Sequence, residues 1–100
     1  MWRSISESEL KELIDRELKK CTSEEHNFFT RYRVSPYKVP IHRLGNLEEV
    51  FVVAELPSGF IYYEDVEEGF EFGSLGTDGA ISKQGCNQYE LKHVLSRLKR

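Results

Sequence analysis

The chain has 100 residues, with 14 Lys and Arg against 17 Asp and Glu, and a formal net charge of −3. That length accommodates one domain, residues 1–100, and leaves no room for a separate catalytic domain. Hydrophobic residues make up 39% and aromatic residues 12%, which excludes a disordered chain. The longest apolar run is residues 50–54, too short to span a bilayer.

The beginning of the chain bears on the compartment. The polar, helix-forming stretch starts within the first six residues, without an apolar segment of the signal-peptide type, so we expect a cytoplasmic protein. In a reducing compartment Cys21 and Cys86 are expected to be free thiols. A near-neutral net charge argues against general nucleic-acid binding. We expect no cofactor, no membrane partner, and either a monomer or a homodimer.

Two helices are predicted at the start of the chain. Ser6 and Glu9 form a capping-box pattern, followed by apolar residues at helical spacing up to Cys21. Thr22 and Glu25 form a second capping-box pattern, which predicts a short helix that ends before Pro36.

The middle of the chain predicts the strands of a sheet. The segments are rich in β-branched and aromatic residues and are separated by Gly, Pro, Asn and Asp. The short connections favour an antiparallel meander, because a parallel pair needs a long crossover. Pro40 cannot donate to a ladder, so its strand is expected at an edge. The predicted strands are residues 37–44, 49–56, 60–65, 70–75 and, as a short final strand, 80–82.

A last helix is predicted near the end of the chain, with Asn87 as its N-cap and Glu90 as the partner at the third position. Its apolar stripe is predicted to pack on the sheet. The expected fold class is therefore α+β: two N-terminal helices, a four- to five-stranded antiparallel meander sheet, and one C-terminal helix packed on it.

Charge is unevenly distributed along the chain. Residues 44–79 contain nine acids and no base, whereas residues 31–43 contain four bases and no acid. Residues 80–100 contain five bases and one acid. Such blocks can pair within the fold, or they can create an acidic face that steers a basic partner.

The acids are densest in residues 64–71. A solvated turn that pairs with the basic last helix is one interpretation, and a weak divalent-ion site is another. The third is an acidic surface edged by aromatic rings that docks a basic protein, because aromatics mixed with one sign of charge are typical of binding surfaces. Gly69 is predicted to have a positive φ or to form a bulge there. The residues predicted to bind the partner are Tyr62, Tyr63, Glu64, Asp65, Glu67, Glu68, Phe70 and Glu71.

The remaining chemistry-bearing residues give weaker patterns. His26, His42 and His93 lack metal-ligand spacing, and we expect no metal site or catalytic residue from them. Cys86 precedes the last helix, so a thiol-dependent enzyme that uses Cys86 with a histidine stays open as an alternative. The basic stretch 31–43 interleaves Arg with aromatics, as single-strand nucleic-acid binders do, but it is expected to complement the acidic block internally.

Three short patterns in the second half of the chain carry a resemblance. Residues 64–70 have the form ED-x-E-x-G-F, residues 78–81 the form DG-x-I, and residues 87–91 the form NQ-x-EL. Over residues 38–98 the chain resembles a group of small uncharacterised bacterial α+β proteins with this pattern, which implies no activity. In size, charge and layout it is also similar to small bacterial immunity proteins, and that likeness assigns no residue a role.

The expected function follows from charge and from the absence of a catalytic pattern. We expect a non-enzymatic binding protein whose acidic face engages a basic protein, with an immunity or inhibitor-like role as its concrete form. A self-associating structural protein that pairs through the edge strand 37–44 is an alternative, beside the Cys86 enzyme.

Overall fold

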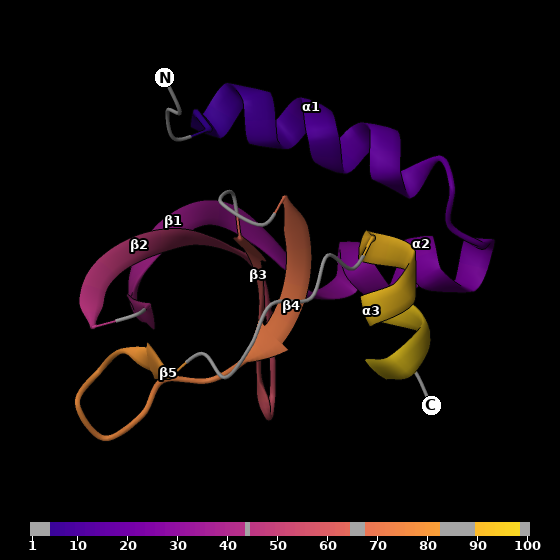
Figure 1. The fold of residues 1–100 in the computed structure, drawn as a ribbon. Coiled ribbons are helices and arrows are strands. Elements are labelled where there is room, and N and C mark those ends of the chain that lie inside the picture. Colours follow the sequence, from indigo (N-terminus) through magenta and orange to yellow (C-terminus); the bar gives the residue numbers. More distant parts are fainter. Residues whose placement is uncertain (1–4, 44, 65–67, 83–89, 99–100) are drawn as a thin grey trace.

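The computed structural model describes residues 5–43, 45–64, 68–82 and 90–98. Within these residues, three helices and four antiparallel strands form an α+β fold, with two helices before the sheet and one after it (Figure 1). The predicted fold class is confirmed at this level. The elements in chain order are α1 (Glu7–Leu18), α2 (Ser23–Tyr32), β1 (Arg33–Arg43), β2 (Asn46–Leu56), β3 (Gly59–Glu64), β4 (Gly69–Gly73) and α3 (Leu91–Leu98).

Both N-terminal helices begin where the capping patterns predict. The Ser6 N–H donates to Glu9 Oε1 at 2.9 Å, and the Glu9 N–H donates to Ser6 Oγ at 3.1 Å. Thr22 and Glu25 make the same reciprocal pair, at 2.9 and 3.1 Å. Each box satisfies N–H groups that a helix start would otherwise leave without a partner.

The strands follow one another as a meander, in the order β4-β3-β2-β1. A fifth segment, β5 (Ile81–Ser82), lies beyond β1 and pairs with it in parallel at Ile41 and His42. It therefore does not extend the antiparallel meander, which has four strands. The chain leaves β4 at one edge of the sheet and returns beside β1 at the other edge. β5 is therefore not joined to β1 by a hairpin turn, and it runs parallel to β1.

The curled sheet has an apolar core on each face. One core lies between the sheet and the helices and contains Leu10, Ile14, Phe29 and Leu95, among others. The other lies inside the curl, where β5 closes it in Figure 1, and is formed by Val39, Ile41, Val50, Val52, Tyr62 and Ile81. The register of β2 against β3 shifts between Val52 and Ala54. Such a shift re-aims side chains, and Val53 and Ala54 both join the core under the helices.

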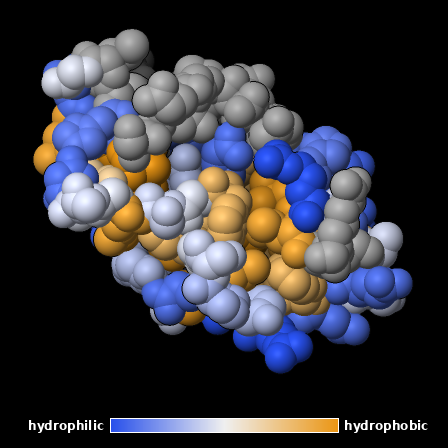
Figure 2. Space-filling model, turned by 90° about the horizontal axis from the view of Figure 1, so that it is seen from below, coloured by the Kyte–Doolittle hydropathy of each residue, from blue (hydrophilic) through white to orange (hydrophobic). Residues whose placement is uncertain are grey.

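The helix layer is held together by α3, which packs against α1, α2 and β4. Several apolar side chains at the margin of this core, Leu56, Phe72 and Leu98 among them, are only partly buried. Figure 2 shows apolar surface between hydrophilic side chains on the face seen from below.

None of the described helices is long and apolar enough to cross a membrane.

Two local predictions are wrong. Glu68, and not Gly69, has the positive φ at the start of β4, at 56°. Glu90 lies before α3, where its carbonyl oxygen accepts from the N–H groups of His93 and Val94 at 3.0 and 3.4 Å. It therefore takes the N-cap position and not the third position of the helix. Asn87, the predicted N-cap, lies outside the described residues.

Candidate functional site

A groove of about 470 Å³ lies between α1, the β3–β4 hairpin and the start of α3. Its lining combines five carboxylates and one guanidinium with an apolar floor. The charged residues are Glu9, Glu12, Arg16, Glu17, Glu68 and Glu90, and the apolar and aromatic ones are Ile5, Leu13, Tyr63 and Phe70. We call this site the acidic groove.

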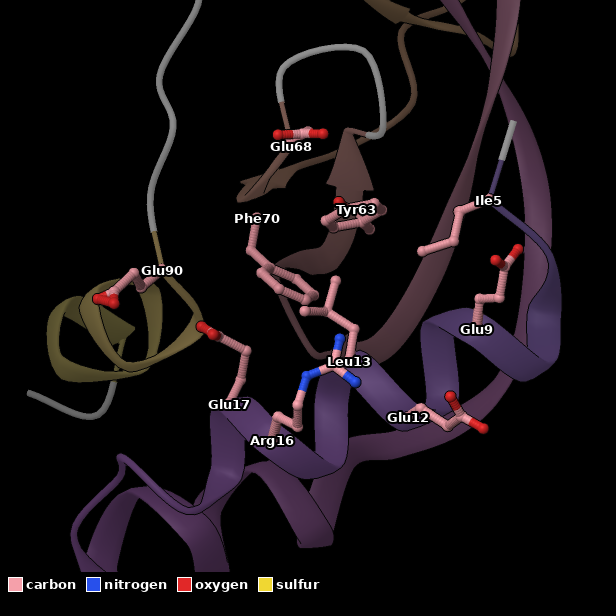
Figure 3. Close-up of a pocket in the computed structure, with 10 residues that line it drawn as sticks. All are labelled: Ile5, Glu9, Glu12, Leu13, Arg16, Glu17, Tyr63, Glu68, Phe70 and Glu90. Carbon is pink, nitrogen blue, oxygen red and sulfur yellow. The ribbon is translucent and has the colours of Figure 1, made fainter. Parts of the chain in front are cut away.

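The floor of the acidic groove is formed by side chains from both layers of the fold. The rings of Tyr63 and Phe70 face each other across the β3–β4 ladder, with centroids 5.0 Å apart. In Figure 3, Leu13 of α1 lies beside the ring of Phe70, and Arg16 reaches toward the same place from one turn further along. Arg16 makes no ion pair with any described residue. The floor is therefore apolar, with one cation at its margin.

Glu17 ties two walls of the groove together. It is buried, with 7% of its surface exposed. Its Oε1 accepts from the Leu91 N–H at 3.1 Å, and its Oε2 accepts from Lys20 Nζ at 2.9 Å. The first bond places a carboxylate at the N-terminus of α3, where the helix dipole favours negative charge. The hydrogen bond with Glu17 is also the main cause that raises the pKa of Lys20 above its usual value.

Glu68 reaches the groove from a backbone conformation that costs energy. Its φ of 56° lies in the left-handed region, which costs a residue with a side chain roughly 1–2 kcal/mol and costs glycine nothing. The next residue, Gly69, has an ordinary φ. The chain thus places a carboxylate, and not glycine, at the strained position beside the groove.

The structure corrects the surface on which partner binding was predicted. Tyr62 is 2% exposed and Glu64 is 0% exposed, and neither lines the acidic groove, so neither belongs to a surface that a partner can reach. Tyr63 and Phe70 are also buried, although they line the acidic groove.

The reason is the alternation of side chains along a strand. Tyr63 belongs to the core under the helices, whereas Tyr62 belongs to the core inside the curl. Glu71 pairs with Tyr62 across β3 and β4, so it shares that second face and is only partly exposed. Glu68 is exposed and lines the groove. Asp65 and Glu67 lie outside the described residues.

In the basic stretch 31–43, the bases Arg31, Arg33 and Lys38 make no described ion pair with the acidic block. Arg31, Arg33 and Lys38 each lie over an aromatic ring, those of Tyr32, Phe29 and Phe51, at 5.4, 5.6 and 5.4 Å. The ion pair of Arg33 is with Asp15 of α1, at 3.8 Å. The two blocks do meet at His42, whose Nε2 lies 2.8 Å from Asp78 Oδ2. His42 also lowers the pKa of Asp78 below its usual value, chiefly through this hydrogen bond.

Cys21 has an environment that disfavours the thiolate. Burial is the main cause that raises its pKa, and Glu25 and Glu17 raise it further. Its Sγ lies 3.5 Å from the carbonyl oxygen of Glu17. Cys86 lies outside the described residues. Among the residues that are described, no group of three or more His, Cys, Asp or Glu could hold a metal ion.

Sequence reasoning missed the contribution of α1 and α3 to the groove. The sequence assigned Glu9 to a capping box and Glu90 to the third position of the last helix, and it gave Glu12 no role. Six positions of α1 or its start recur at helical spacing on the side of the groove, namely residues 5, 9, 12, 13, 16 and 17. That spacing could have indicated that these residues share one side of the helix, but it could not show which part of the fold that side faces.

Comparisons of the chain with protein-family models, with curated proteins and with solved structures find no match. The functional argument therefore depends on the groove itself.

Proposed function

We propose that the chain is a cytoplasmic, non-enzymatic binding protein whose acidic groove receives basic side chains of a protein partner, as an immunity protein or another protein inhibitor would. One observation carries the proposal. Five carboxylates from α1, the β3–β4 hairpin and the start of α3 line the groove around its aromatic floor. Arg16 is the one cation among the lining residues, and Lys20 pairs with Glu17 and Glu90 from outside the lining.

The chemistry of the groove suits a long basic side chain. The methylenes of a Lys or Arg can lie against Leu13 and against the small part of the Tyr63 and Phe70 rings that stays exposed, while the charged end reaches the surrounding carboxylates. The net negative lining also speeds the encounter with a basic surface, to a degree that falls as salt rises.

The strained backbone of Glu68 supports the same proposal. Strain at a non-glycine residue persists only where the rest of the structure maintains it, and such residues cluster at functional sites. Here the strain places a carboxylate beside the groove at a position where glycine would be unstrained. A role in binding accounts for a carboxylate at this strained position.

Arg16 has a defined part in this proposal. Its guanidinium lies at the groove without an ion pair among the described residues, where an incoming cation would approach. Like charges repel, so Arg16 opposes a partner that offers only bases. Replacing Arg16 with Gln should therefore tighten the binding of a purely basic probe.

The test uses a capped pentapeptide, Gly-Arg-Gly-Lys-Gly, as a basic probe. Titration into ¹⁵N-labelled protein should move the amide signals of Leu13, Tyr63, Glu68 and Phe70 in a saturable way. The same peptide with Glu and Asp in place of its bases is the matched control and should move none of them. If the basic peptide shifts signals evenly over the acidic surface, the groove is not the binding site.

A further inference from the structure

A second cavity lies on the opposite flank of α1 from the acidic groove. Successive helical residues are about 100° apart, so Lys11 points about 200° around the helix from Glu9. Lys11 lines a cavity of about 460 Å³ between α1, the end of α2 and the first residues of β1. The other lining residues are Thr30, Arg33, Val34, Ser35 and Pro36. No carboxylate is among these six residues, and we call the cavity the basic notch.

The polar groups of the basic notch come from three elements. Lys11 belongs to α1, Thr30 to α2, and Arg33 and Ser35 to β1. Together they offer an ammonium, a guanidinium and two hydroxyls, all of which can donate hydrogen bonds. The register of β1 against β2 shifts between Arg33 and Tyr37, so residues 34–36 leave the regular ladder where they line the notch. This irregularity places Ser35 and Pro36 in the wall of the cavity.

Arg33 is held in place while keeping part of its surface open to solvent. Its guanidinium lies over the ring of Phe29, 5.6 Å from the ring centre, and Phe29 is fully buried. The side chain nevertheless keeps 34% of its surface exposed. A guanidinium that a ring holds in place loses less freedom when it binds a ligand.

The acids near the notch are weak competitors for its two cations. Lys11 Nζ lies 3.2 Å from Glu7 Oε2, and both side chains are about half exposed. The Arg33–Asp15 pair is long, at 3.8 Å, and Asp15 is 67% exposed. Exposed pairs of this kind contribute about 0–1 kcal/mol, whereas charge-assisted bonds from Arg and Lys to phosphate are shorter and stronger. An incoming anion can therefore displace these carboxylates.

We propose that the basic notch binds a phosphoryl group, as the dianion of a phosphate monoester. Two cations match a charge of about −2 at neutral pH. Donors that three elements contribute to one cavity suit the three free oxygens of a tetrahedral phosphoryl group better than the planar, two-oxygen face of a carboxylate. The phosphoryl group belongs to a small phosphorylated molecule or to a phosphoserine of a partner. This site is separate from the acidic groove and does not depend on the function proposed for it.

The first experiment is an amide-shift titration of the ¹⁵N-labelled chain with inorganic phosphate, a capped phosphoserine peptide, and the same peptide with Glu in place of phosphoserine. We expect saturable shifts at Thr30, Arg33 and Ser35 with the first two probes. A phosphoserine peptide that binds more tightly than inorganic phosphate assigns the group to a protein partner, and equal affinities assign it to a small molecule. Binding of the Glu peptide as tight as that of the phosphoserine peptide overturns the proposal, and so does the absence of saturable shifts at the notch.

Variants separate the notch from general surface charge. Arg33→Gln should weaken phosphate binding by about tenfold or more, the equivalent of about 1.4 kcal/mol. Lys38→Gln removes a base further along β1 that lies over the ring of Phe51, outside the notch, and should leave the affinity unchanged. Equal losses in the two variants would show a nonspecific charge effect and reject the site.

A gain-of-binding variant remains informative even if Arg33→Gln fails to fold. Asp15→Asn removes the carboxylate next to Arg33 and should tighten phosphate binding by about two- to fivefold, as expected for an exposed pair. Glu49→Gln changes the net charge equally at an exposed position of β2 and should change the affinity less. If both variants tighten binding by the same factor, long-range charge and not the notch controls it.

Discussion

Replacement of Glu17 tests how the groove walls are joined. Its carboxylate accepts the Leu91 N–H at 3.1 Å in a buried position and Lys20 Nζ at 2.9 Å at the surface. A hydrogen bond to a charged group contributes about 1.5–3 kcal/mol, and the exposed ion pair with Lys20 adds little. Glu17→Ala should therefore lower the free energy of unfolding by about 1.5–3 kcal/mol.

Chemical denaturation with urea measures this loss, and thermal unfolding should show a Tm lower by ~10–20 °C for a domain of this size. Glu17→Gln keeps an oxygen that can accept from Leu91, so its loss should be about 1 kcal/mol. Glu12→Ala, on the exposed side of the same helix, is the control and should stay within about 0.5 kcal/mol of the wild type. A Glu17→Ala protein as stable as the Glu12→Ala protein would refute the reasoning, because the bond to α3 would then contribute nothing.

Three further predictions concern local chemistry. Glu68→Gly relieves the left-handed strain but adds the entropy that glycine loses on folding, so the free energy of unfolding should rise by only about 0.5 kcal/mol. The same variant should weaken binding of the basic peptide. A loss of stability would contradict the strain argument. Because the pKa of Asp78 is lowered in the folded state, its contribution to stability is present above the usual carboxyl pKa and is lost as pH falls through the folded-state pKa. In Asp78→Asn, the free energy of unfolding measured with urea should therefore depend less on pH below about pH 5, and its pH dependence on the alkaline side should be unchanged. In a Cys86→Ser protein, the raised pKa of Cys21 should make its reaction with iodoacetamide at neutral pH slower than that of a cysteine peptide, and an equal rate would contradict the burial of the thiol.

The sequence predicted what depends on neighbouring residues. Both capping boxes, at Ser6 and Thr22, involve groups three residues apart, and both formed as expected. The four antiparallel strands follow from short connections and β-rich segments. The order of the elements was therefore accessible without the structure.

Other features depend on contacts that are distant in the chain. Glu17 and Leu91 are 74 positions apart, and no local pattern marks one as the acceptor for the other. Tyr62 and Tyr63 are neighbours in sequence but belong to the two opposite cores, so a surface predicted from consecutive residues was divided between two faces of the sheet. The parallel pairing of β5 likewise results from where the chain crosses the sheet.

The central claim, that the acidic groove recognises bases, is tested most directly by the affinity of the Gly-Arg-Gly-Lys-Gly peptide for two double variants of equal charge. Glu9→Lys/Glu12→Lys reverses two acids of the groove, and Glu24→Lys/Glu49→Lys reverses two acids outside it. Two reversed charges at the groove correspond to about 1.4 kcal/mol, so we predict about tenfold weaker binding for the first pair and a change within about twofold for the second. Equal weakening in the two proteins at about 0.15 M salt would contradict the claim, because net charge and not the groove would then govern binding.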